Sequence, residues 1–256
     1  MLSLNLVMAC ASPPPTFEEV RPAEELYQRG VEILEGRLVL GLLRRIDHAA
    51  AIETFQTIID NYPYSDYAVL AELKIADAYF ANRKYEEALS YYRDFGELHP
   101  RQDQVAYTIF RSAICHQRRI ASHQRDQTAT RDALVYLDRL LTRYPHSEYA
   151  ERAEVMWRDL RMRLALQIKD IGDFYMRRGE YEAAVERYRS LLNEYPGLGL
   201  DPEILYKLGL CYGEMNRDDE AAAIFQSIVR YYDKSSVAED AREQMARGRD
   251  WNPRAP

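Results

Sequence analysis

The sequence is short of the residues that carry covalent or metal chemistry. It has only three cysteines, and no two of them stand in a CxxC spacing, which excludes a disulfide framework. It has no HExxH, GxSxG or glycine-rich phosphate-binding motif, and its five histidines are scattered along the chain. The sequence therefore offers no candidate nucleophile, metal site or cofactor site, and we expect that the protein is not an enzyme.

The chain also lacks an excess of basic residues and a long apolar run. Its 34 Lys and Arg against 41 Asp and Glu give a formal net charge of -7, which argues against a dedicated nucleic-acid-binding protein. No stretch approaches the roughly 20 consecutive apolar residues of a transmembrane helix. Apolar residues make up 47% and charged residues 29% of the chain, as in ordinary globular proteins. One residue type is abundant: there are 20 tyrosines.

A repeated pattern accounts for the alanines and aromatic residues. An alanine is followed four residues later by a large apolar or aromatic residue, and seven residues after that by a ring, usually before proline. The alanines are 37, 45, 51 and 37 residues apart, and the five copies begin at Ala51, Ala88, Ala133, Ala184 and Ala221. Twelve residues before three of them stand Ala76, Gly172 and Gly209. This spacing is typical of tetratricopeptide (TPR) repeats, in which small residues let two antiparallel helices approach closely.

The pattern predicts an all-α fold, a right-handed TPR superhelix of about five helix-turn-helix repeats with a C-terminal capping helix. Ser65 and Ser147 follow Tyr-Pro turns, where a serine can cap the next helix. Residues 148–178 contain no proline and predict one long helix. We therefore divide the chain into an N-terminal block of three repeats at 23–147, a C-terminal block of two repeats at 148–233, and a capping helix and tail at 234–256.

The first 22 residues precede the repeats. Leu6 to Cys10 resembles the end of a bacterial lipoprotein signal, in which a cysteine becomes lipid-modified. We expect residues 1–9 to be the remnant of a truncated signal peptide, and residues 10–22 to be a lipidated cysteine and linker. The alternative is an apolar N-terminus with an incidental cysteine.

The arrangement as a whole resembles the BamD family of outer-membrane assembly lipoproteins. The resemblance covers roughly residues 10 to 233 and rests on Cys10, the linker prolines 13–15, the five hairpins, and the Tyr-Pro segments 61–65 and 143–149. It implies a periplasmic protein held by lipid to the outer membrane. It also implies two kinds of partner, a BamA-like barrel protein and unfolded β-barrel precursors. The first repeat departs from the family in carrying an apolar insertion, residues 38–43.

Three functions compete for such a chain. The first is a non-enzymatic component of the β-barrel assembly machinery that binds the BamA-type subunit and unfolded clients. The second is another periplasmic TPR adaptor of the cell envelope, although adaptors of that kind usually carry an N-terminal coiled coil. The third, an enzyme, has no candidate residues.

Two surfaces are candidate binding sites. The first helices of repeats one to three are expected to line a concave, apolar groove for the client, formed by Tyr27, Val31, Leu34, Leu70, Leu73, Phe80, Tyr107, Phe110 and Ile114. The insertions of repeats one and three, or the linker, could instead cover it. The C-terminal block is expected to dock the BamA-like partner through Lys169, Asp173, Arg177 and Arg187, which could instead be merely solvated. Cys115 and Cys211 are expected to be free and buried.

Overall fold

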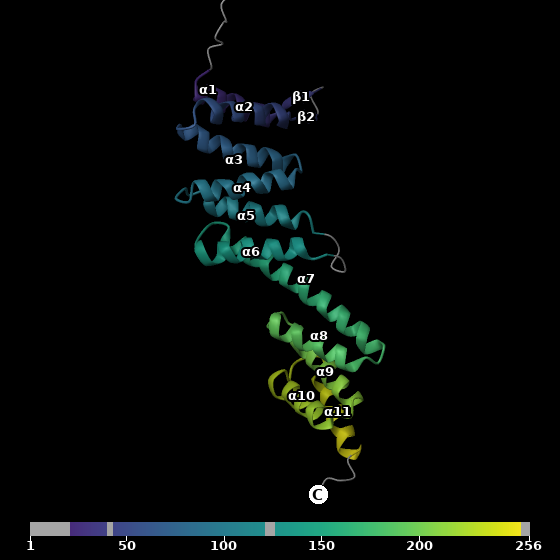
Figure 1. The fold of residues 1–256 in the computed structure, drawn as a ribbon. Coiled ribbons are helices and arrows are strands. Elements are labelled where there is room, and N and C mark those ends of the chain that lie inside the picture. Colours follow the sequence, from purple (N-terminus) through teal and green to yellow (C-terminus); the bar gives the residue numbers. More distant parts are fainter. Residues whose placement is uncertain (1–20, 40–42, 121–125, 252–256) are drawn as a thin grey trace, which may run out of the picture. The chain divides into compact units, whose positions relative to one another are not determined.

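The computed structural model describes residues 21–39, 43–120 and 126–251. Within these ranges the chain forms eleven helices and one two-stranded antiparallel ribbon (Figure 1). Cys10 and most of the expected linker lie outside the described residues, as do 40–42 and 121–125 within the two insertions. The elements are α1 (Ala23–Glu35), β1 (Arg37–Val39), β2 (Leu43–Arg45), α2 (His48–Asn61), α3 (Asp66–Ala81), α4 (Tyr85–Leu98), α5 (Val105–Gln117), α6 (Thr128–Arg143), α7 (Ala150–Arg177), α8 (Tyr181–Glu194), α9 (Asp201–Glu214), α10 (Asp218–Tyr231) and α11 (Ala238–Trp251).

The chain divides into two compact units, residues 1–82 and 83–256. The first holds α1, the ribbon, α2 and α3, and the second holds α4 to α11. This boundary falls inside the second expected repeat. The division into repeat blocks 23–147 and 148–233, and the right-handed course of the superhelix, stay predictions.

In the first unit, α1 and α2 pack against each other, and α3 packs on both. Gly30 of α1 allows the close approach: a Cβ atom there would lie 2.5 Å from the Cζ of Phe55, whose side chain is fully buried. Gly36 ends α1 with a φ of 77°, a conformation that favours glycine. The chain then turns into the ribbon, in which Arg37 pairs with Arg45 and Val39 with Leu43. The apolar insertion of repeat one is thus partly β structure, which the all-α prediction did not include.

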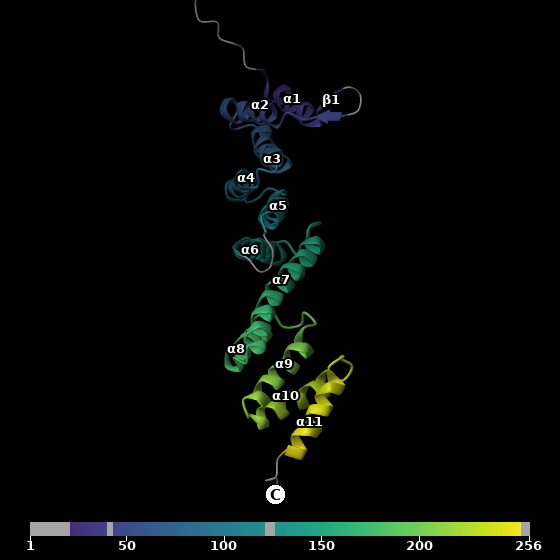
Figure 2. The ribbon, with the colours of Figure 1, turned by 90° about the vertical axis from the view of Figure 1, so that its right-hand side faces the viewer.

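In the second unit, consecutive helices from α4 to α11 pack against their neighbours along the chain. The long helix predicted between repeats three and four is confirmed as α7, which has 28 residues and a length of about 42 Å (Figure 2). The contact between a glycine and a ring recurs twice, between Gly172 and Tyr188 and between Gly209 and Phe225. The repeat alanines are also buried, which confirms the helical-repeat fold: Ala51, Ala88, Ala133 and Ala184 at 0% exposure and Ala221 at 6%.

The two expected serine caps differ. The Oγ of Ser65 accepts a hydrogen bond from the backbone N–H of Ala68 at 3.2 Å and caps α3. Ser147 does not cap α7, because the helix begins only at Ala150 and the buried Oγ of Ser147 has no hydrogen-bond partner among the described residues. The prediction is therefore confirmed at Ser65 and wrong at Ser147.

Candidate functional site

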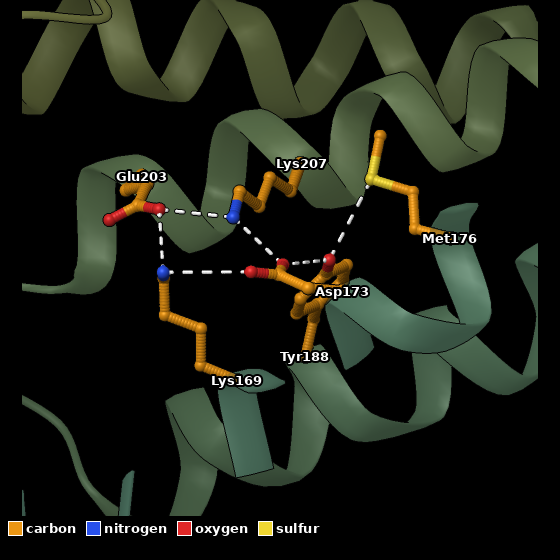
Figure 3. A network of polar contacts seen from close by, with 6 residues as sticks. All are labelled: Lys169, Asp173, Met176, Tyr188, Glu203 and Lys207. Atoms are coloured by element: carbon orange, nitrogen blue, oxygen red, sulfur yellow. Dashed lines mark hydrogen bonds and ion pairs between the residues drawn. The ribbon is translucent and has the colours of Figure 1, made fainter. Parts of the chain in front are cut away.

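A network of ion pairs and hydrogen bonds connects three helices of the second unit (Figure 3). Lys169 and Asp173 lie one turn apart on α7, and Glu203 and Lys207 lie one turn apart on α9, with the order of charges reversed. The Nζ of Lys207 is 2.7 Å from Asp173 Oδ1 and 3.0 Å from Glu203 Oε1. The Nζ of Lys169 is 3.1 Å from Glu203 Oε1 and 3.6 Å from Asp173 Oδ2. Each lysine therefore bridges the same two carboxylates, and the four charges balance.

Helix α8 contributes a fifth member to this network. The hydroxyl of Tyr188 donates a hydrogen bond to Asp173 Oδ1 at 2.6 Å, and Met176 Sδ lies 3.6 Å from the same hydroxyl. Tyr188 is fully buried, and its ring packs on Gly172 of α7. Asp173 therefore contacts both the Tyr188 side chain that packs on Gly172 and the lysine of α9.

The charges of the network are fixed around neutral pH. Burial alone would raise the pKa of Asp173, but hydrogen bonds from Lys207 and Tyr188 and the charges of both lysines outweigh it and lower that pKa. The same balance lowers the pKa of Glu203. Burial would lower the pKa of Lys169, yet its two carboxylate partners raise it.

The pKa of the Tyr188 hydroxyl is shifted as well. Burial first, and then the hydrogen bond to Asp173, raise the pKa of its hydroxyl far above the ordinary value. The two carboxylates and Lys169 are therefore ionised and Tyr188 is neutral at pH 7. Because all of these pKa values are moved away from neutrality, the network suits holding α7, α8 and α9 together and does not suit proton transfer.

Beside the network, α7 exposes apolar side chains. We define the α7 patch as Asp170, Ile171, Phe174 and Arg177. Ile171 is 38% and Phe174 48% exposed, and the patch lines a hollow of about 480 Å³ together with Asp173. Ile171 and Phe174 were not among the site residues predicted from the sequence. Their exposure could have been predicted from the helical periodicity, because both lie on a different face of α7 from the buried residues Ala165 and Gly172.

The four predicted docking residues fall into two groups. Lys169 and Asp173 are paired within the network, with side chains only 19% and 18% exposed, so they are not merely solvated. Arg177 and Arg187 are exposed. The structure therefore brings Lys169 and Asp173 together with Glu203 and Lys207, which the sequence analysis did not name, and leaves Arg187 apart from them.

The predicted groove residues of the first unit lie on α1 and α3. Tyr27 is half-buried, and its ring contacts the rings of Phe55 and Tyr67, with centroids 5.7 and 5.6 Å away. The remaining members in this unit are also half-buried: Val31, Leu34, Leu70, Leu73 and Phe80. Each therefore keeps part of its surface accessible within this unit.

The predicted groove residues of the second unit lie on α5 and are less accessible. Phe110 is 2% and Ile114 9% exposed, so the expectation that they form an exposed patch is wrong. The ring of Tyr149 stacks on Phe110 at 5.5 Å, and the guanidinium of Arg152 lies 4.9 Å from the Phe110 ring centroid. Of the two covering residues, Tyr149 immediately precedes α7 and Arg152 lies in its first turn. Tyr107 remains half-buried and also contacts Tyr149.

The two cysteines of the described residues lie among the buried residues of α5 and α9. Cys115 and Cys211 are free and buried, as predicted. Burial raises the pKa of their thiols to about 12 and about 11, which makes both unreactive. The described residues contain no group of His, Cys, Asp or Glu that could hold a metal ion. None of the described helices is long and apolar enough to cross a bilayer.

Comparison with known proteins settles the family. A protein-family model described as outer membrane lipoprotein, YfiO, matches residues 21–223. The chain belongs to the YfiO family. The resemblance stated from the sequence is thereby confirmed.

Several curated relatives of this YfiO-family chain carry the name outer membrane protein assembly factor BamD. The protein from Caulobacter vibrioides is 28% identical over 82% of this chain and 66% of its own length, so the chain spans just under two thirds of that relative. The Vibrio cholerae protein is 27% identical over 77% of this chain and 81% of its own length. The Rickettsia prowazekii protein is 26% identical over 90% and 88%.

Proposed function

We propose that this YfiO-family chain is a non-enzymatic scaffold of the outer-membrane β-barrel assembly machinery. The proposal is supported by the family match and by the assembly-factor name of its relatives. In this proposal the chain is anchored through lipid on Cys10 to the periplasmic face of the outer membrane. It binds two partners, a BamA-type barrel subunit and unfolded β-barrel precursors.

The α7 patch is the proposed docking site for the barrel subunit, and it is the observation that carries the proposal. An exposed aromatic ring next to charged side chains is the usual composition of a binding hot spot. The network beneath supports it: because Asp173 is tied to α8 and α9, this part of α7 is held rigidly. A rigid site loses less conformational freedom on binding. Arg177, and Arg187 on α8, would set orientation and association rate more than affinity.

The test is the affinity of the Phe174→Ala variant for the periplasmic domains of the BamA-type subunit from the same genome. Removing a hot-spot ring costs about 2 kcal/mol or more, so we expect the Kd to rise about 30-fold. Val155→Ala is the matched control, because Val155 is an apolar residue of the same helix with 58% exposure. The docking site would be wrong if both variants bound as the unchanged chain does, or if Val155→Ala weakened binding equally.

The half-buried apolar residues of α1 and α3 are the proposed contact for the client. Tyr27, Leu70 and Leu73 combine an aromatic ring with aliphatic side chains that keep accessible surface. An unfolded barrel strand, with its alternating apolar residues, would bury them further. Phe110 and Ile114 are already covered, so their contribution would require Tyr149 and Arg152 to move aside.

A photo-crosslinker at Leu73, offered a C-terminal barrel peptide, tests the client site. We expect a crosslinked product several times more abundant than from the same group at Glu53, an exposed position of α2 in the same unit. The larger yield follows from apolar burial of the peptide against α1 and α3. Equal yields at the two positions would assign Leu73 to the core of the unit alone.

The alternative function, another periplasmic TPR adaptor, predicts different partners. Purification of the chain from native membranes distinguishes the two. Recovery of a BamA-type protein favours the assembly machinery, and recovery of other envelope proteins without it favours the adaptor.

A further inference from the structure

The ribbon in the first unit carries a cluster of arginines beside exposed apolar residues. Arg37, Arg44 and Arg45 are all exposed, and Leu38 and Ile46 are 64% and 39% exposed. Among the described residues, no carboxylate lies within ion-pair distance of these three arginines. Nothing in the repeat fold requires this ribbon, because α1 and α2 already pack through Gly30 and Phe55.

The sequence gives the ribbon a charge opposite to that of the whole chain. Residues 37–46 contain three arginines and no acidic residue, whereas the chain has a formal net charge of -7. The five residues from Val39 to Leu43 are all apolar or glycine. Exposed apolar residues flanked by arginines suit contact with a layer that has an apolar interior and an anionic surface. The apolar side chains can be buried in the interior while the long arginine side chains reach back to the anionic surface.

A hollow lies at the base of the ribbon and is lined by arginines. Arg29, Arg37 and Arg45 line a hollow of about 590 Å³, together with the carboxylates of Glu32 and Asp47. Asp47 is partly engaged elsewhere, since it accepts a hydrogen bond from the N–H of Ala50 at the start of α2. Three guanidinium groups against two carboxylates leave the lining of the hollow with a formal excess of one positive charge, which favours an anionic group.

We propose that this ribbon, defined by Arg37, Leu38, Arg44, Arg45 and Ile46, is a contact site for a bilayer containing anionic phospholipid. Leu38 enters the boundary between headgroups and acyl chains, and the arginines bind the phosphates. The proposal is independent of lipid on Cys10 and of either protein partner. It adds a second membrane contact, which would orient the first unit against the bilayer.

Position-specific fluorescence tests the proposal on the full chain carrying Cys10→Ser, which prevents acylation. Leu38→Cys introduces a thiol for an environment-sensitive dye, and the buried Cys115 and Cys211 do not compete for it. The matched control is Leu98→Cys on α4, because Leu98 is 68% exposed. The probes are vesicles of phosphatidylethanolamine with phosphatidylglycerol, and vesicles of phosphatidylcholine alone.

We expect the dye at position 38 to shift its emission to the blue on the anionic vesicles, and the dye at position 98 not to shift. Replacing Arg44 and Arg45 with glutamine should lower the partition coefficient about 25-fold, at about fivefold for each charge. The matched replacement of Arg131 and Arg143, two exposed arginines of α6, should leave it unchanged.

Three results would overturn the proposal. The first is an unchanged emission at position 38 with anionic vesicles, and the second is an equal shift at position 98. The third is a shift at position 38 that rises with protein concentration and needs no vesicles, which would assign the ribbon to a second copy of the chain.

Discussion

Replacing Gly209 with alanine is expected to destabilise the protein by about 1–3 kcal/mol, the usual cost of inserting a methyl group into a packed core. A Cβ atom at Gly209 would lie 2.7 Å from the Cε1 of Phe225, and Phe225 is 6% exposed. Because that ring is buried in the core of the second unit, it has little room to move away. The urea midpoint should fall with little change in slope.

Gly213, one turn further along α9, provides the control. A Cβ atom there would meet no other atom within 4 Å, and Gly213 is exposed. Gly213→Ala should therefore leave the stability unchanged or raise it by up to about 1 kcal/mol, because alanine is the better helix former. Each variant adds one methyl group to the same helix, at positions one turn apart. If both shifted the midpoint in the same direction by the same amount, the tight contact with Phe225 would be refuted.

This contact belongs to the part of the fold that could be predicted from the sequence. Gly209 and Phe225 stand at fixed offsets in the repeat, as do Gly172 and Tyr188. A small residue opposite a ring is needed wherever two helices approach closely, so the spacing itself indicates the packing. The long α7 was predictable for a similar reason, since no proline interrupts it.

Other features depend on contacts that no local pattern encodes. Phe110 has the spacing of a groove residue, but it is covered by Tyr149, which lies 39 residues further along the chain. The apolar insertion of repeat one was visible, but its antiparallel pairing was not, because periodicity cannot distinguish a strand from a buried helix segment in a short apolar run. At the candidate docking site, Lys169 and Asp173 were found as charges on one helix face. Their partners Glu203 and Lys207 come from the next hairpin.

The second large effect is expected at Asp173. Asp173→Ala removes the acceptor for the hydroxyl of the buried Tyr188 and one of two carboxylates shared by Lys169 and Lys207. Loss of one partner costs about 3–5 kcal/mol for a fully buried pair and about 0–1 kcal/mol for an exposed pair. Because the Asp173 side chain is 18% exposed, we expect a loss of about 2–3 kcal/mol at pH 7, measured by urea unfolding.

Asp159→Ala is the matched control for this loss. Asp159 is an exposed aspartate on the same helix, and surface substitutions of this kind usually change stability by less than about 0.5 kcal/mol. Tyr188→Phe isolates the hydrogen bond from the ion pairs. If the hydroxyl acts through Asp173, the double variant should lose less than the sum of the two single variants. Strict additivity would contradict the shared network.

The pH dependence of this loss distinguishes the carboxylate from simple packing. The pKa of Asp173 in the folded chain is lowered from its ordinary value of 3.8, so its contribution is complete above that value and is lost as the pH falls through the folded pKa. The stability difference between the unchanged chain and Asp173→Ala should therefore stay constant from pH 7 to about pH 5 and shrink only below about pH 4. A difference that persisted in acid would mean that Asp173 contributes by packing alone. A difference that vanished near pH 6 would mean that the pH dependence comes from a histidine, because a carboxylate with a lowered pKa does not become protonated at that pH.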